Sequence, residues 1–319
     1  MRFVTMGDGA RLGVIDGGSV LDVTKAARLA KSKQKFTSLL ELIEAGQRGL
    51  DTVRSLIETT RGLSEPGLRT DLSSAKLSAP WAGQRLVMAG ANNAEHVSEC
   101  FTHMGTPITP QQVRENTRKG TPGAFWAAAR PLMGPGARIE IPARALGIFD
   151  YEGEPALVIG KRGKDIKAAD ANSYIWGVTL VIDWSIREEA WPPPPASPLA
   201  LVKNFDCSKS IGPAISVGET DVDDIWVETY VNGERRQKFS SREMIFSFAE
   251  VLEYLSRDLT FYPGDVITLG TGAGTVIDSM RLNADGSWPK ERFLKPGDTV
   301  EVLSPAVGSL VGHVVAKSN

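Results

Sequence analysis

Three carboxylates in the middle of the chain have the spacing of a binding site for a hard cation. Glu152 and Glu154 are two residues apart, and on an extended segment such residues point to the same face. Asp183 ends a second predicted strand, the apolar run 178–182. Carboxylates at the edge of a core are costly unless a cation neutralises them. Three oxygen ligands favour Mg²⁺, with Mn²⁺ or Ca²⁺ as alternatives, over Zn²⁺; a solvated acidic strand beside an unrelated aspartate is the structural alternative.

A histidine and a glutamate one helical turn apart form a candidate water-activating pair. If residues 92–99 are helical, His96 and Glu99 share a face, and Glu99 can orient the imidazole and raise its basicity. A surface histidine paired with Glu99 is the simpler alternative. A transition-metal site formed by His96, Glu99, Cys100 and His103 is disfavoured, because four ligands from one short helix cannot easily surround an ion.

Two cations and a glycine-rich loop are candidates for contact with an anionic substrate. Arg187 and Lys203 follow the predicted aspartate ligand, and fixed cations there would suit a substrate carboxylate or a developing oxyanion; solvated surface charges are the alternative. Gly270 and Thr271 open a Gly-Thr-Gly-Ala-Gly loop after a predicted strand. The loop lacks the lysine of a phosphate-binding loop and the glycine spacing of a dinucleotide site. We expect a tight turn whose amides and Thr271 approach a ligand.

The elements around these residues predict a small first domain followed by a larger, β-rich one. Residues 1–75 combine short strands with two helices, 39–45 and 50–61, that end at glycines. The stretch 64–80 has the Ser, Pro and Asp content of a linker. Residues 76–319 form the second domain. Its strongest strand candidates are the sequences GPGARIEIP, PALVIG, GVTLVIDWS and PGDVITLG.

Two further segments of the second domain have recognisable patterns. An apolar stripe over residues 244–255 predicts a helix capped by Ser240 or Ser241. The proline run at 191–195 predicts an exposed or lid-like loop. Together these patterns indicate an α+β fold that is mainly β.

Composition narrows the class of protein. The 319 residues carry 36 basic and 38 acidic side chains, so a net charge of −2 gives no field that would draw the chain to nucleic acid. Every apolar run is shorter than the roughly 20 residues that span a bilayer, so we expect no membrane insertion. Two cysteines and the absence of a signal-like start favour a reducing, cytoplasmic location. The expected partner is a small molecule.

Five ordered blocks of sequence resemble the fumarylacetoacetate hydrolase family, and the likeness covers roughly residues 84–315. The blocks are FDYEGEPALVIGKRGKDI, GVTLVIDWSIRE, KNFDCSKSIGPAI, VNGERRQKFSSREMIFSFAEVLEYLSRDLTFYPGDVITLGTGAG and FLKPGDTVEVLSPAVGSL. GANNAEHVSE, which contains Asn92, is similar to the family motif that carries a lid dyad. The resemblance implies a mixed β-sandwich roll with a small N-terminal α/β domain, in a homodimer.

The resemblance also implies roles for individual residues. Glu152, Glu154 and Asp183 match the metal ligands, and His96 and Glu99 match the water-activating dyad. The remaining matches lie on the substrate side: Arg187 and Lys203 as cations, Thr271 and Gly270 in the glycine-rich loop, and Asn92 in the lid motif.

Four positions depart from the family pattern. Asn93 stands where the family usually has Tyr, Ala127 where a lysine is common, Ala190 where hydrolases often have Gln, and Gly272 where Pro is common. These changes affect the substrate side and leave the predicted metal ligands intact.

The function expected from these residues is hydrolytic cleavage of a carbon–carbon bond in a β-diketone or a 2,4-dioxo acid, such as an acylpyruvate. Water deprotonated by His96 would attack a carbonyl beside a Lewis-acidic cation. The enzymatic alternatives are an oxaloacetate-type decarboxylase and a dehydratase or hydrolase of 2-oxo-3-deoxy sugar acids. A non-catalytic metal-binding or ligand-binding protein is the alternative of another class.

Overall fold

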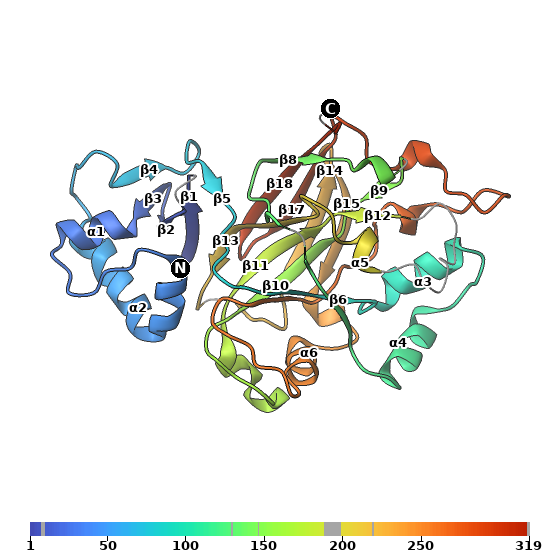
Figure 1. Ribbon diagram of the computed structural model, residues 1–319, viewed down its shortest axis with the longest axis horizontal. Helices are drawn as coiled ribbons and strands as arrows, with labels where there is room; N and C mark the ends of the chain where they lie inside the picture. The colour runs from blue at the N-terminus through green and yellow to red at the C-terminus, as the bar shows by residue number, and fades with distance from the viewer. Residues whose placement is uncertain (8–9, 129, 146, 188–198, 219, 318–319) are drawn as a thin grey trace.

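Two packed β-sheets form the body of the molecule in the computed structural model, which describes residues 1–7, 10–128, 130–145, 147–187, 199–218 and 220–317 (Figure 1). The larger sheet has the strand order β4-β3-β2-β1-β13-β11-β10-β16-β6-β7, with β5 paired to β1. The smaller sheet has the order β15-β14-β17-β18-β8, and β9 pairs with β12. The strands are β1 Arg2–Met6, β2 Arg11–Asp16, β3 Ser19–Asp22, β4 Arg69–Asp71, β5 Leu77–Ser78, β6 Leu86–Gly90, β7 Gly123–Trp126, β8 Ala137–Glu140, β9 Phe149–Asp150, β10 Gly153–Ile159, β11 Ile175–Asp183, β12 Ser185–Ile186, β13 Lys209–Ser216, β14 Trp226–Val231, β15 Glu234–Ser240, β16 Val266–Thr268, β17 Thr299–Ser304 and β18 Gly308–Val315.

Helices lie at the edges of this sandwich. The α-helices are α1 Val23–Leu29, α2 Leu39–Thr59, α3 Ala94–His103, α4 Pro110–Arg118, α5 Leu199–Val202 and α6 Phe248–Leu255. The 3-10 helices are η1 Ala143–Ala145, η2 Ala168–Tyr174, η3 Ser241–Glu243, η4 Ile277–Ser279 and η5 Lys290–Arg292. In the described ranges, no helix has the length and apolar content needed to span a membrane.

Glycines allow the two sheets to approach closely. A Cβ on Gly153 of β10 would lie 2.4 Å from Oγ1 of Thr229 on β14. A Cβ on Gly312 of β18 would lie 2.5 Å from the ring of Trp184, which follows β11. Both distances are shorter than real Cβ contacts, so larger residues would push the sheets apart. The core between the sheets therefore depends on these two positions as well as on its apolar side chains.

The N-terminal strands continue the larger sheet, and α1 and α2 lie beside them (Figure 1, blue). The two predicted helices are present and joined into α2, with a break at Gly46, whose φ of 56° is left-handed. The predicted linker, in contrast, contains β4 and β5. These strands form because β3 and β1 offer free backbone edges, and Arg69 adds a 2.6 Å ion pair with Asp16. The domain boundary at residues 75 and 76 stays a prediction.

The predicted helix over 244–255 is shorter than expected. Ser240 caps η3 instead, and Met244 is extended (ψ 154°), which ends that turn. A second capping box, Ser247 with Glu250, then starts α6 at Phe248. The four strand candidates of the second domain are confirmed as β8, β10, β11 and β16. The fold is mainly β with mixed sheets, as predicted, and the proline run at 191–195 lies outside the described residues.

Candidate metal centre and active site

The three predicted carboxylates converge at the ends of β10 and β11. The backbone amides and carbonyls of Glu152 and Asp183 are hydrogen-bonded to each other, at 3.1 and 2.9 Å, just outside the ladder between the two strands. Glu154 lies two residues further along β10, on the same face. Carboxylate oxygens of the three residues lie within 4.8 Å of one another, and each side chain is buried. The expectation that these acids share one face is therefore confirmed.

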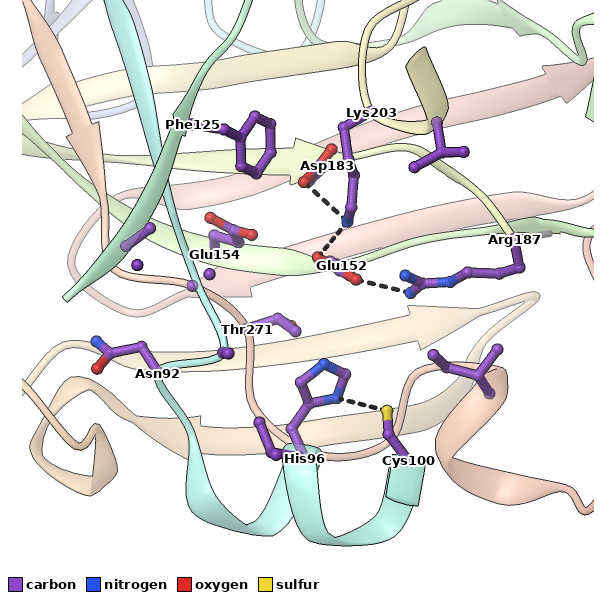
Figure 2. A pocket seen from close by; sticks show the side chains of 18 of the residues that line it. Asn92, His96, Cys100, Phe125, Glu152, Glu154, Asp183, Arg187, Lys203 and Thr271 are labelled. Carbon is purple, nitrogen blue, oxygen red and sulfur yellow. Dashed lines mark hydrogen bonds and ion pairs between the residues drawn. The ribbon is translucent and has the colours of Figure 1, made fainter. Parts of the chain in front are cut away.

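Cations lie beside two of the three acids (Figure 2). Lys203 Nζ lies 2.7 Å from Glu152 Oε2 and 3.1 Å from Asp183 Oδ2. Arg187 lies 2.7 Å from Glu152 Oε1 and also pairs with Asp150, at 3.0 Å. The predicted cations thus lie at the predicted acids.

One further cation, Lys209, was not found by sequence reasoning. Its Nζ lies 2.8 Å from Asp183 Oδ1, and the side chain is fully buried. The residue stands directly opposite Asp183 in the ladder between β11 and β13. Lys209 reaches Asp183 because β11 pairs with β13, and no pattern in the sequence predicted that pairing. Burial lowers the pKa of Lys209 more than Asp183 raises it.

Glu154 is the acid that lacks a cation. Its Oε2 is buried without a hydrogen-bond partner among the described residues. Burial, followed by the nearby charges of Asp183 and Glu152, raises its pKa well above the ordinary value. Burial also opposes ionisation of Glu152, but Lys203 and Arg187 outweigh it and lower that pKa. A partnerless oxygen in an all-oxygen donor set fits a hard divalent cation held by Glu152, Glu154 and Asp183.

His96 faces these acids from helix α3 and is held by Asp278 (Figure 2 shows the imidazole rising toward Glu152). His96 Nδ1 donates to Asp278 Oδ2 at 2.8 Å, while Asp278 Oδ1 accepts from the Cys100 thiol at 2.9 Å. Burial disfavours the imidazolium, but Asp278 and Cys100 outweigh it and raise the pKa of His96 well above 6.5. Across the described ranges, no hydrogen bond involves Nε2, which leaves this nitrogen free for a substrate.

The predicted pairing of His96 with Glu99 is not what the structure shows. In the described part of the chain no hydrogen bond joins the two side chains, and Glu99 is absent from the cavity wall. The reason is that η4 packs on α3 and places Asp278 at Nδ1. Asp278 is 182 residues away in sequence, so helical spacing gave no sign of it.

Replacing Asp278 by Asn should lower the pKa of His96, because burial would then oppose the imidazolium with less compensation. The ion pair stabilises the fold at pH below the ordinary histidine value of 6.5 and is lost as pH rises through the higher folded-state pKa. The difference in unfolding free energy between wild type and variant should therefore be largest near pH 6 and shrink with rising pH. Urea unfolding across that range, with imidazole titration by NMR, checks this. A difference that does not vary with pH would contradict it.

A cavity of about 490 Å³ lies between the carboxylates and α3. Its wall includes His96, Arg187, Lys203, Gly270 and Thr271 together with all three acids. Apolar side chains form much of the remainder: Val97, Phe101, Met104, Phe125, Ile186, Val202, Ile277 and Trp288.

Asn92 and Thr271, two of the predicted substrate contacts, also form hydrogen bonds that hold segments of the protein together. Asn92 donates to the carbonyls of Phe246 and Leu269 and accepts from the Phe246 amide, so its side chain joins three segments. The Thr271 hydroxyl donates to the Gly153 carbonyl and accepts from Gln237. Their hydrogen-bonding groups are thus largely used within the protein. Binding of substrate by Asn92, Gly270 and Thr271 stays a prediction.

The departures from the family pattern have local explanations at three positions. Asn93 caps α3, its side chain accepting from the His96 amide at 3.0 Å. A Cβ at Gly272 would lie 2.4 Å from the Phe239 ring, which explains the small residue there. Ala127 is buried in the apolar core beside the larger sheet. Ala190 lies outside the described residues.

Comparison with known proteins gives a consistent set of relatives. The sequence profile described as "Fumarylacetoacetate (FAA) hydrolase C-terminal" matches residues 85–315. Oxaloacetate tautomerase YisK of Bacillus subtilis is 28% identical over 309 residues, which cover 94% of each chain.

Solved structures share the fold over the whole chain. A fumarylacetoacetate hydrolase from Exiguobacterium antarcticum superposes with a TM-score of 0.71 and 26% identity, covering 99% of this chain and 100% of that one. A maleylpyruvate hydrolase from Sphingobium sp. SYK-6, in complex with manganese(II) and pyruvate, has a TM-score of 0.71 and 22% identity, with both chains fully covered. The second likeness shows the fold alone.

Proposed function

The chain belongs to the fumarylacetoacetate hydrolase family, and on that premise we propose that it is a divalent-metal-dependent enzyme that hydrolyses a carbon–carbon bond in a 2,4-dioxo acid with an apolar acyl group. The observation that carries this proposal is the cavity itself. A cluster of three buried carboxylates forms one wall, and a histidine with a free ring nitrogen lies across from it.

The residues of the chain can carry out the proton transfers that hydrolysis needs. A divalent cation at Glu152, Glu154 and Asp183 supplies Lewis-acid polarisation of the substrate oxygens when it is bound. In the neutral form of His96, whose ring proton lies on Nδ1 toward Asp278, Nε2 takes a proton from water, and the hydroxide attacks the acyl carbonyl carbon. The carbon–carbon bond then breaks, the acyl group leaves as a carboxylic acid, and the enolate fragment receives the proton back from His96.

The electrostatics of the site support both halves of this cycle. Asp278 stabilises the imidazolium that forms when His96 holds the proton. Arg187 and Lys203 place two positive charges beside the carboxylates. There they can stabilise the negative charge that develops on the enolate and the charge that the substrate carboxylate carries.

The apolar wall indicates the substrate class. Among the described lining residues the fixed cations are Arg187 and Lys203, and both already pair with acids. A second substrate carboxylate would therefore lie against apolar side chains such as Phe101 and Trp288 without a partner. An alkyl or aryl acyl group would bury its surface there instead. This favours an acylpyruvate over a dicarboxylate.

Keto–enol tautomerisation of a 2-oxo acid is the second candidate. Two observations favour it: YisK, a relative that matches 94% of this chain, is named an oxaloacetate tautomerase, and Glu99 is not paired with His96. Tautomerisation needs a single group to move a proton between oxygen and the adjacent carbon, and His96 Nε2 can do this without a water-activating dyad.

A substrate series separates the two candidates. We expect purified protein with Mn²⁺ to convert acylpyruvates to pyruvate and a carboxylic acid, identified by mass. Each added methylene should raise kcat/KM about fourfold until the wall is filled, because burying one methylene contributes about 0.8 kcal/mol. Faster enol-to-keto conversion of oxaloacetate, with intact acylpyruvates, would replace the first candidate by the second. Inactivity on both substrates would contradict both.

The physiological metal and the assembly stay predictions. Mg²⁺ remains the expected ion, with Mn²⁺ or Ca²⁺ as alternatives, since all have the oxygen preference of the three carboxylates. The cytoplasmic location and the homodimer also remain expectations, and size-exclusion chromatography with light scattering would test the dimer.

A further inference from the structure

A second group of metal-ligating side chains lies across the cavity from the carboxylates. His96 and Cys100 are one turn apart on α3, and Asp278 comes from η4. His96 Nδ1 lies 2.8 Å from Asp278 Oδ2, Cys100 Sγ lies 2.9 Å from Asp278 Oδ1, and Cys100 Sγ lies 3.9 Å from His96 Nδ1. One ligand atom of each residue falls within 4.8 Å of the others.

Asp278 belongs to η4 and not to α3. The ligands of this cluster therefore come from two segments, and the objection that one short helix cannot surround an ion does not apply to it. Ligands from α3 alone would all lie on one side of an ion, whereas Asp278 approaches from another segment. Its carboxylate is held in place, because Oδ2 also accepts from the amides of Gly274 and Thr275, at 2.9 and 3.0 Å. Zinc bonds of about 2.0–2.3 Å place neighbouring ligand atoms about 3–4 Å apart, so small side-chain shifts suffice.

The donor set differs from that of the carboxylate cluster. An imidazole nitrogen, a sulfur and one carboxylate oxygen suit a thiophilic divalent cation, whereas three carboxylates suit a hard one. His96 and Cys100 both line the cavity, which gives an ion a path from solvent and leaves a coordination position open. On binding, the Cys100 thiol, and His96 if it is protonated, would release a proton to solvent.

We propose that His96, Cys100 and Asp278 form a second metal site for a thiophilic cation such as Zn²⁺, and that its occupation stops His96 from acting as a base. A cation on Nδ1 forces the ring proton onto Nε2, the nitrogen free to meet a substrate. Nε2 then cannot accept a proton. The binding part of this proposal stands on the cluster alone, while the inhibitory part rests on the proposed function.

Cadmium titration of the full chain tests the binding. Wild-type protein should show a thiolate-to-cadmium charge-transfer band in the ultraviolet that saturates at one equivalent. The Cys207→Ser variant is the matched control, because Cys207 lies outside the cluster, and it should keep the band. Glu154→Gln, which disrupts only the hard-cation site, should also keep it. Cys100→Ser should lose the band, and Asp278→Asn should weaken cadmium affinity at least about tenfold.

Several outcomes would overturn the site. These are no band in the wild type, a band retained in Cys100→Ser, or a band lost in Glu154→Gln. Circular dichroism of each variant confirms that it is folded, and the Asp278→Asn affinity keeps the test valid if Cys100→Ser does not fold.

Inhibition is measured separately with the substrate that the enzyme turns over. With saturating Mg²⁺, Zn²⁺ should inhibit the wild type, and Cys100→Ser should need at least about tenfold more Zn²⁺ for the same fractional loss of its own rate. A cadmium band without zinc inhibition would overturn the inhibitory role while the site stands. Absence of turnover on any tested oxo acid would count against the proposed function and leave the band as evidence for the site.

Discussion

Replacing Glu154 by Gln should reduce turnover by about 10³-fold. The substitution keeps the shape of the side chain but removes one of three charges that would hold the divalent cation. A Lewis acid supplies several kcal/mol to such a reaction, and each 1.36 kcal/mol changes the rate tenfold. Steady-state kinetics with an acylpyruvate at increasing Mn²⁺ would measure the loss.

Thermal unfolding gives a readout of the same substitution that does not depend on the substrate. At a hundredfold excess over its Kd, a ligand stabilises a folded protein by about 2.7 kcal/mol, so Mn²⁺ should raise the Tm of the wild type and chelation should lower it. The Tm of Glu154→Gln should respond weakly to both. Glu115→Gln is a matched control, because Glu115 is exposed on α4 outside the cavity wall, and it should behave as wild type. Full wild-type activity after exhaustive chelation would contradict the assignment.

The part of the site that sequence could predict is the part in which neighbours along the chain are also neighbours in space. Glu152 and Glu154 share a face because strand residues alternate, and Asp183 was placed by its position after an apolar run. Pairing of β10 with β11 then brings the two segments together, a contact only about 30 residues apart along the chain. The resemblance to a known family then favoured these three residues as metal ligands over other pairs of acidic residues in the sequence.

The residues that sequence reasoning missed are held by contacts between distant segments. Asp278 reaches His96 because η4 packs on α3, and Lys209 reaches Asp183 through the ladder of β11 with β13. Helical spacing suggested Glu99 as the partner of His96 because it considers one helix alone. Spacing along one helix says nothing about an acid from a distant segment such as Asp278. Asp278 is also more deeply buried than Glu99.

The same distinction applies to the fold. Strand alternation and glycine positions predicted β8, β10, β11, β16 and the break in α2, since these depend on local backbone preference. The short strands β4 and β5 were missed, because their sequence has the composition of a loop and they form by completing the edges of strands already present.

Replacing His96 by Gln should lower kcat by about 10²- to 10⁴-fold while metal affinity at the carboxylates is retained. The range is that of general acid–base catalysis by one positioned group. Gln cannot exchange a proton, yet it preserves most of the volume that the imidazole occupies between α3 and Glu152 (Figure 2). Single-turnover kinetics measure the chemical step, and Mn²⁺ titration followed by the Tm shift measures metal binding.

His313→Gln is the matched control for this prediction, because His313 is an exposed residue on β18 outside the cavity wall, and its turnover should be that of wild type.

The split between turnover and metal affinity also separates an enzyme from a protein that only binds metal or ligand. A binding protein has no use for a base, so the substitution would leave its ligand response unchanged. A base that acts on the substrate affects the rate without holding the cation. Wild-type turnover in His96→Gln would therefore show that His96 is not the proton-transferring group. A loss of Mn²⁺ affinity in parallel with the loss of turnover would contradict that role as well.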